Sequence, residues 1–175
     1  GSTGGVGSIA IAILSKLGYS ITAISGKQER INFLKEIGAN EIILREEFEA
    51  ESKKPLLSEK YAGVIDTVGG KILANALKQV KYDGVVTCCG LISSHELNTN
   101  IFPFILRGIR LIGIDSVECK LEKKQAAWEK LASRWKINSL NTIINEITLD
   151  EIKTAYEHLL SGEAVGRFVV KIKEE

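Results

Sequence analysis

The sequence predicts an α/β protein with a Rossmann-type, doubly wound parallel sheet. Residues 1–7 form a glycine-rich turn that leads directly into helical apolar spacing. Beyond this turn, short apolar runs bounded by glycine alternate with charged helical patterns, and an alternation of strands with helices is typical of parallel sheets. The 175 residues, 45% of them hydrophobic, are also enough to bury a sizeable core.

The first half of the chain supplies three strands and three helices. Apolar residues recur at helical spacing from Val6 to Leu17, and Gly18 provides a C-terminal stop. A charged stretch broken by Pro55 follows the second strand, and we expect it to be a mobile surface segment. The expected elements are a helix over 6–17, a strand over 19–25, a helix over 27–37, a strand over 41–44, the mobile segment over 45–60, a strand over 62–68 and a helix over 71–80.

The second half continues with strands over 85–89 and 110–115, a helix over 121–135, an extended segment over 143–147, a helix over 150–160 and a final strand over 166–172. In a Rossmann unit the glycine turn follows the first, central strand. We therefore expect that strand to precede residue 1 and the chain to be part of a longer protein. The expected division is a cofactor-binding domain over 1–139 and a segment over 140–175 that returns, through its last strand, toward an N-terminal catalytic domain.

Composition excludes several classes of partner. The net charge is +1, so no overall field would recruit nucleic acid or an anionic membrane. The apolar runs are far shorter than the roughly 20 residues that span a bilayer. The three cysteines and two histidines show no metal-ligand spacing. We expect a cytoplasmic protein with reduced thiols, no metal site, no nucleic acid partner and no membrane partner.

The glycines of the turn predict a dinucleotide-binding site. A phosphate approaches the free N–H groups of a helix N-terminus only where bulky side chains are absent, and Gly4, Gly5 and Gly7 meet that need. A flexible loop is the alternative, but the helix behind the turn and the strand over 19–25 give the context that a dinucleotide fold requires. The glycine spacing suits both short-chain dehydrogenases and zinc-free medium-chain reductases.

The residues at the end of the strand over 19–25 indicate the type of cofactor. Enzymes that use NAD place an acidic residue about 20 residues after the glycines, where it binds the ribose 2′-hydroxyl. This chain has Ser25, Gly26 and Lys27 there, which suit a 2′-phosphate. Arg45, after the next strand, is expected at the same adenosine end, with a solvated surface arginine as the alternative. The sequence therefore predicts NADPH.

Two observations select the family. No tyrosine has a lysine four residues later, which argues against a short-chain dehydrogenase. The whole chain resembles the C-terminal, cofactor-binding half of zinc-free medium-chain reductases, in the acrylyl-CoA reductase and quinone oxidoreductase branch. The motifs that carry this resemblance are Ser2-Thr3-Gly4-Gly5-Val6-Gly7, Ala23-Ile24-Ser25-Gly26-Lys27, Leu34-Lys35-Glu36-Ile37-Gly38-Ala39, Ile65-Asp66-Thr67-Val68-Gly69, Cys89-Gly90-Leu91, Pro103-Phe104-Ile105-Leu106-Arg107, Arg110-Leu111-Ile112-Gly113-Ile114-Asp115-Ser116-Val117 and Gly166-Arg167.

The resemblance implies roles for particular residues. Those expected at the pyrophosphate are Thr3, Gly4, Gly5 and Val6, and those expected at the 2′-phosphate end are Ser25, Gly26, Lys27 and Arg45. Leu91, Ile105 and Ser116 are expected at the nicotinamide and its ribose, where backbone groups fix the ring face that delivers hydride. The family often has a polar side chain where this chain has Gly162.

The function implied is hydride transfer from NADPH to an activated C=C bond of an enoyl thioester, an enone or a quinone. No catalytic residue is identified, and the chain alone is expected to be inactive. The alternatives are an NADPH-binding module without catalysis and an assembly partner. The final strand could form the edge of a homodimer.

Four further residues are of types that can carry chemistry. Asp66 and Asp115 end strands, and either could contact a ribose or cap the following turn. Cys88 and Cys89 lie on an expected buried strand with no histidine nearby in sequence, so core packing is expected rather than redox chemistry.

Overall fold

The computed structural model describes residues 1–50 and 52–172, and these form two compact units. Of the described residues, Gly1, 43–50 and 52–125 belong to unit 1, and 2–42 and 126–172 belong to unit 2. Each unit has its own buried hydrophobic cluster, so each is described by itself. No helix among the described residues is long and apolar enough to cross a membrane.

Unit 2 opens with the helix that the glycine turn predicts. Helix α1 (Gly5–Lys16) is followed by β1 (Thr22–Ser25), the short 3-10 helix η1 (Gln28–Arg30) and α2 (Ile31–Glu36). Strand β2 (Glu41–Leu44) begins in this unit, continues into the stretch assigned to unit 1 and pairs with β1. Gly18 ends the first helical segment with a φ of +83°, a conformation that glycine adopts without steric cost. The predicted elements of this region are confirmed, with β1 starting three residues later than expected.

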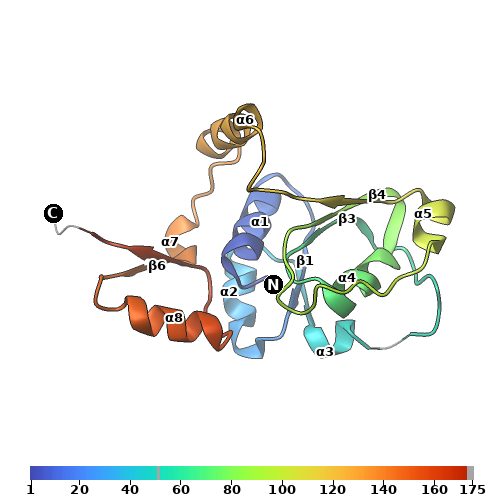
Figure 1. Cartoon of the computed structure of the whole chain (residues 1–175), viewed down its shortest axis with the longest axis horizontal. Coiled ribbons are helices and arrows are strands. Elements are labelled where there is room, and N and C mark those ends of the chain that lie inside the picture. Colours follow the sequence, from blue (N-terminus) through green and yellow to red (C-terminus); the bar gives the residue numbers. More distant parts are fainter. Residues whose placement is uncertain (51, 173–175) are drawn as a thin grey trace. The chain divides into compact units, whose positions relative to one another are not determined.

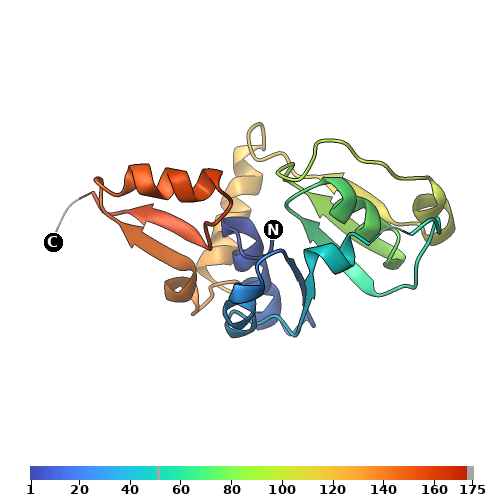
Figure 2. The same cartoon turned by 90° about the horizontal axis from the view of Figure 1, so that it is seen from below.

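The C-terminal part of unit 2 forms a small parallel sheet. Helix α7 (Leu140–Ile143) leads into β6 (Ile144–Ile147), and α8 (Ile152–Leu160) connects β6 to β7 (Arg167–Val170). The two strands run parallel, with Ile144 opposite Arg167 and Ile147 opposite Val170. Figures 1 and 2 show α8 lying alongside this sheet. The final strand β7 therefore pairs with β6 of the same chain. The sequence had led us to expect a partner strand outside the cofactor-binding domain.

Unit 1 is built on a three-stranded parallel sheet. Strand β4 (Val80–Cys88) lies between β3 (Tyr61–Asp66) and β5 (Arg110–Gly113). Helix α4 (Gly70–Leu77) connects β3 to β4, and α5 (Phe102–Arg107) precedes β5. The core comprises Leu73, Leu77, Val80, Val86 and Ile109. Figure 2 shows α4 beside the strands. An α/β fold with parallel strands is thus confirmed, although the strands form three separate sheets.

Three local expectations were incomplete or wrong. The segment over 45–60 begins with a helical turn, α3 (Arg45–Phe48), whose Phe48 is buried, so this part is not a simple surface loop. Residue 51 lies outside the described residues. Helix α5 forms over the apolar run of residues 101–106, to which no element was assigned. Helix α6 (Leu121–Ala132) forms where expected but ends before Trp135 and has no buried residue.

Candidate cofactor site

The glycine turn in unit 2 leaves the start of α1 open to an anion. Gly4 is the N-cap of the 12-residue helix and provides no side-chain hydrogen bond, and the first turn holds no acidic residue. The buried Ser8 donates its hydroxyl back to the Gly4 carbonyl at 2.9 Å. Thr3, within the same turn, is also buried. The helix thus presents its positive end without a competing carboxylate.

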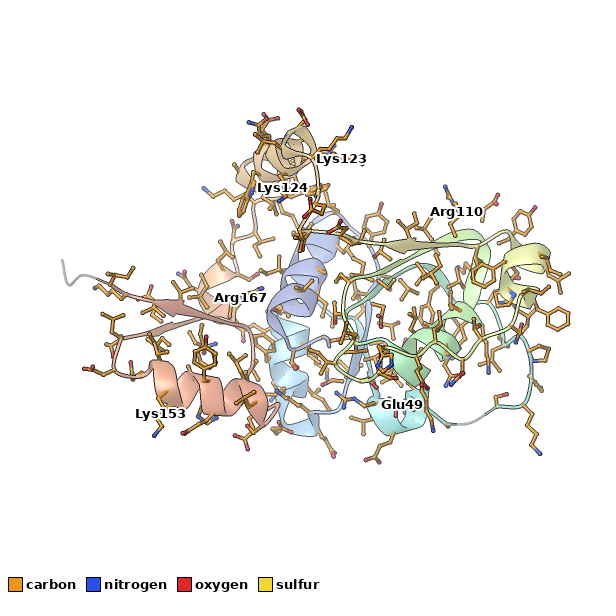
Figure 3. All side chains as sticks on the ribbon, in the orientation of Figure 1. Glu49, Arg110, Lys123, Lys124, Lys153 and Arg167 are labelled. Carbon is orange, nitrogen blue, oxygen red and sulfur yellow. The ribbon has the colours of Figure 1, made fainter. Side chains whose placement is uncertain are left out.

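The C-terminal strand closes around the same turn. Gly166 donates its N–H to the Thr3 carbonyl at 2.7 Å, and Gly4 and Gly166 form an isolated parallel bridge. A Cβ added to Gly5 would lie 2.7 Å from three atoms of the Arg167 guanidinium group. Figure 3 shows Arg167 reaching from β7 toward α1. A cation therefore lies against the glycine turn, and the sequence analysis had assigned it no role.

The segment over Ser25–Lys27 forms a second polar group in unit 2. Ser25 is only 3% exposed at the end of β1, and its Oγ accepts the N–H of Lys27 at 3.0 Å. The Lys27 ammonium donates to the carbonyl of Ala164 at 2.6 Å. Gly26 between them is exposed. The predicted 2′-phosphate residues thus lie in an ordered turn that contacts the C-terminal segment.

Unit 1 has an open cavity at the carboxyl ends of β4 and β5. Its volume is about 410 Å³, and its lining residues are Cys88, Cys89, Gly90, Leu91, Gly113, Ile114 and Asp115. The N–H of Ile114 donates to the Cys88 carbonyl at 2.9 Å and extends the pairing of the two strands. Carboxyl ends of parallel strands are the usual ligand-binding edge of an open α/β sheet.

The predicted site residues divide between the two units. Thr3, Gly4, Gly5, Val6, Ser25, Gly26 and Lys27 belong to unit 2, while Arg45, Leu91, Ile105 and Ser116 belong to unit 1. Leu91 lines the cavity and Ser116 directly follows its last lining residue. Ile105 does not line it, because α5 lies at the end of the sheet where β5 begins (Figure 1). Arg45 is exposed at the start of α3.

The acidic residues at the strand ends organise turns. Both Asp66 oxygens accept the N–H of Gly69, at 2.9 and 3.2 Å. One Asp115 oxygen accepts the N–H groups of Val117 and Glu118, at 2.8 and 3.2 Å. Of the two roles left open for these residues, the structure therefore displays the turn-capping one.

The cysteines of this edge differ from expectation. Cys88 ends β4 and is half-buried, whereas Cys89 lies beyond the strand and is exposed, so the expectation that Cys89 packs in the core was wrong. Partial removal of the thiol from water, together with the nearby Asp66 and Cys88, raises the pKa of Cys89. A raised pKa disfavours the nucleophilic thiolate. Among the described residues, no group of three or more His, Cys, Asp or Glu side chains could hold a metal ion.

Asp66 gives a pH-dependent prediction. Its burial raises the pKa of the carboxyl group, more than the backbone hydrogen bonds from Gly69 and Val68 lower it. The folded chain then holds this proton more tightly than the unfolded chain does, so stability from Asp66 falls as pH rises from about 4 through the raised pKa. In urea denaturation, Asp66→Asn should gain stability relative to the wild type across that window. A difference that stays constant with pH would contradict this expectation.

Comparison with known proteins shows the family to which the chain belongs. A family described as "Zinc-binding dehydrogenase" matches residues 5–135. The chain is 40% identical over 173 residues to the "Putative quinone oxidoreductase YhfP" of Bacillus subtilis. It is 42% identical over 172 residues to the "Probable acrylyl-CoA reductase AcuI" of Escherichia coli. Each match covers 98% of this chain and 52% of the relative, so the chain spans about half the length of these relatives.

Two solved structures are also similar to this chain in sequence and in fold. The crystal structure of E. coli K-12 YhdH with bound NADPH has a TM-score of 0.93 and 42% identity, and the match covers 99% of this chain and 53% of that one. The structure of B. subtilis YhfP with NAD bound has a TM-score of 0.94 and 40% identity, covering 98% and 53%. Both similar structures contain a nicotinamide dinucleotide.

Proposed function

Because this chain belongs to the zinc-binding dehydrogenase family, in its acrylyl-CoA reductase and quinone oxidoreductase branch, we propose that it is the NADPH-binding half of an oxidoreductase. The observation that carries the proposal is the open N-terminus of α1 at a glycine turn, with the Arg167 guanidinium against Gly5. The reductase to which this half is proposed to belong is a cytoplasmic, zinc-free medium-chain reductase. Residues 1–139 are proposed to form a Rossmann-type cofactor-binding domain, and residues 140–175 a segment that returns toward an N-terminal catalytic domain.

The pyrophosphate is proposed to bind at the glycine turn. Backbone N–H groups of Gly4, Gly5 and Val6 bind an anion best where no side chain intervenes, and Thr3 forms the wall before them. Arg167 adds a guanidinium group, which binds phosphate through paired hydrogen bonds. Since a Cβ on Gly5 would meet this guanidinium, glycine at that position keeps both groups within reach of one ligand.

The adenosine end is proposed to bind at Ser25, Gly26, Lys27 and Arg45. A cationic lysine favours the 2′-phosphate of NADPH, and the carboxylate that would repel this phosphate is absent from the segment. The ordered turn over Ser25–Lys27 supports this assignment, since the lysine is already held at both its backbone and its ammonium group.

The nicotinamide end is proposed to lie near Leu91, Ile105 and Ser116. Two of these positions are supported by the cavity at the ends of β4 and β5. Leu91 lines this cavity, and Ser116 follows its last lining residue. Bound NADPH would supply a hydride to an activated C=C bond of an enoyl thioester, an enone or a quinone. The residues of this chain would bind the cofactor, orient the ring through backbone groups and exclude water. A further domain would complete the substrate pocket.

The proposal is tested by titrating this chain with NADPH and with NADH. Binding is monitored by fluorescence energy transfer or by calorimetry. NADPH should bind more tightly than NADH. Turnover of acrylyl-CoA and of a quinone is then measured on a protein extended at its N-terminus. Absence of binding by either cofactor would contradict the proposal, and binding without turnover in the extended protein would favour a non-catalytic NADPH-binding module.

Arg167→Ala is expected to weaken NADPH and NADH equally, by about tenfold, because both cofactors carry the pyrophosphate that the guanidinium would bind. Arg110→Ala is the matched control, since Arg110 is an exposed arginine of β5 in unit 1 (Figure 3). The control should leave both affinities unchanged. Unequal losses for the two cofactors would place Arg167 at the 2′-phosphate instead.

A further inference from the structure

We propose that the loop after α8, residues 161–166, positions Lys27 for the 2′-phosphate and thereby contributes to the preference for NADPH over NADH. This inference rests on the proposed function. It assigns a role in cofactor choice to a loop that lies outside the predicted cofactor-binding residues.

The central contact joins two distant parts of unit 2. Lys27 and Ala164 are 137 residues apart, yet the Lys27 ammonium donates to the Ala164 carbonyl at 2.6 Å. This bond holds the ammonium group at a defined position beside the loop. The other end of Lys27 is fixed by the bond from its N–H to Ser25 Oγ. A lysine held in this way loses less conformational freedom when it binds a phosphate.

The loop itself has a defined backbone. The N–H groups of Glu163 and Ala164 both donate to the His158 carbonyl, at 3.0 and 3.1 Å. This turn depends on Gly162, whose φ of +74° lies in the left-handed region. Glycine is favoured in this conformation, asparagine tolerates it and β-branched residues do not. Gly162 thus sets the direction in which the chain leaves α8.

The far end of the loop is fixed independently. Asn145 donates its side-chain amide to the Val165 carbonyl at 2.7 Å, and Gly166 donates to the Thr3 carbonyl. With both ends of the loop held, the Ala164 carbonyl has a set position relative to β1 and the turn that follows it. The same segment therefore borders the glycine turn through Gly166 and the lysine through Ala164.

The test compares two substitutions at Gly162. A Cβ at this position would have no atom within 4 Å, so Gly162→Val alters the backbone preference without creating a clash, and Gly162→Asn is the matched control. Gly162→Val should weaken NADPH about tenfold, the effect of losing one charged hydrogen bond, and leave NADH unchanged. Gly162→Asn should bind both cofactors like the wild type.

A double-mutant cycle shows whether the effect passes through Lys27. Lys27→Ala should remove most of the preference for NADPH, and adding Gly162→Val to it should change the ratio of the two affinities no further. Equal weakening of both cofactors by Gly162→Val, or independent effects in the double variant, would overturn the proposal. If Gly162→Val does not fold, Asn145→Leu provides the same comparison from the other end of the loop.

The outcomes also separate this inference from the proposed function. A wild-type chain that binds neither cofactor contradicts the proposed function. A chain that prefers NADPH, loses the preference in Lys27→Ala and keeps it in both Gly162→Val and Asn145→Leu contradicts only the role of the loop.

Discussion

Replacing Gly5 by valine is expected to weaken NADPH binding about 100-fold, equivalent to about 2.7 kcal/mol. The added Cβ would lie 2.7 Å from the Arg167 guanidinium, and the branched side chain would fill the approach to the N-terminus of α1. Both proposed pyrophosphate ligands would be affected by one substitution. The chain should still fold, because Arg167 is exposed and its side chain can move away.

The matched control is Gly63→Ala on β3. Its added Cβ would meet only the Val85 carbonyl, at an ordinary 3.5 Å, and it lies in unit 1. Affinity is measured by titration with NADPH, and folding by thermal denaturation of both variants. If Gly5→Val bound NADPH within a few-fold of the wild type while remaining folded, the glycine turn would not be the pyrophosphate site.

Replacing Arg107 by methionine is expected to lower the free energy of unfolding by about 3 kcal/mol. The Arg107 side chain is only 11% exposed and lies 3.4 Å from a Glu59 carboxylate oxygen. It also donates to the carbonyls of Leu57, Lys78 and Val80. Methionine preserves much of the volume but leaves these acceptors without their donor. The substitution would loosen the connection between α5, β4 and the segment before β3.

Arg110→Met is the control for this second prediction. Arg110 is exposed, and its guanidinium makes one 3.4 Å bond to the Asp83 carbonyl, so a change within about 0.5 kcal/mol is expected. Urea denaturation of both variants gives the comparison. Similar small losses at the two positions would show that the Arg107 contacts contribute little to stability.

Local pattern explains which parts of the fold were predictable. The helix from the glycine turn to Gly18 and the strands over 41–44, 61–66 and 144–147 follow from spacing and from glycine stops within a few residues. The helical turn with the buried Phe48 did not, because its charged neighbours and Pro55 suggest a solvated loop. Tertiary packing of one aromatic side chain overrides that local signal.

The candidate cofactor segments, the glycine turn and Ser25–Lys27, are predictions that follow from residue types and spacing. The contacts of Arg167 with Gly5 and of Lys27 with Ala164 were not predicted, because local patterns do not show which distant residues come together. The motif Gly166-Arg167 marked the segment that contains Arg167 but not its contact. Ile105 was assigned by resemblance alone and does not line the cavity at the ends of β4 and β5, so its role stays a prediction.

The discontinuous composition of unit 2 has a consequence for biosynthesis. Its residues come from both ends of the chain, while residues 43–125 of unit 1 are contiguous. A nascent chain exposes folding units in order from its N-terminus, so the ribosome would complete unit 1 first. The glycine turn, although made early, acquires Gly166 and Arg167 only when translation has reached them. Until then the newly made chain would display the turn without the strand that closes around it.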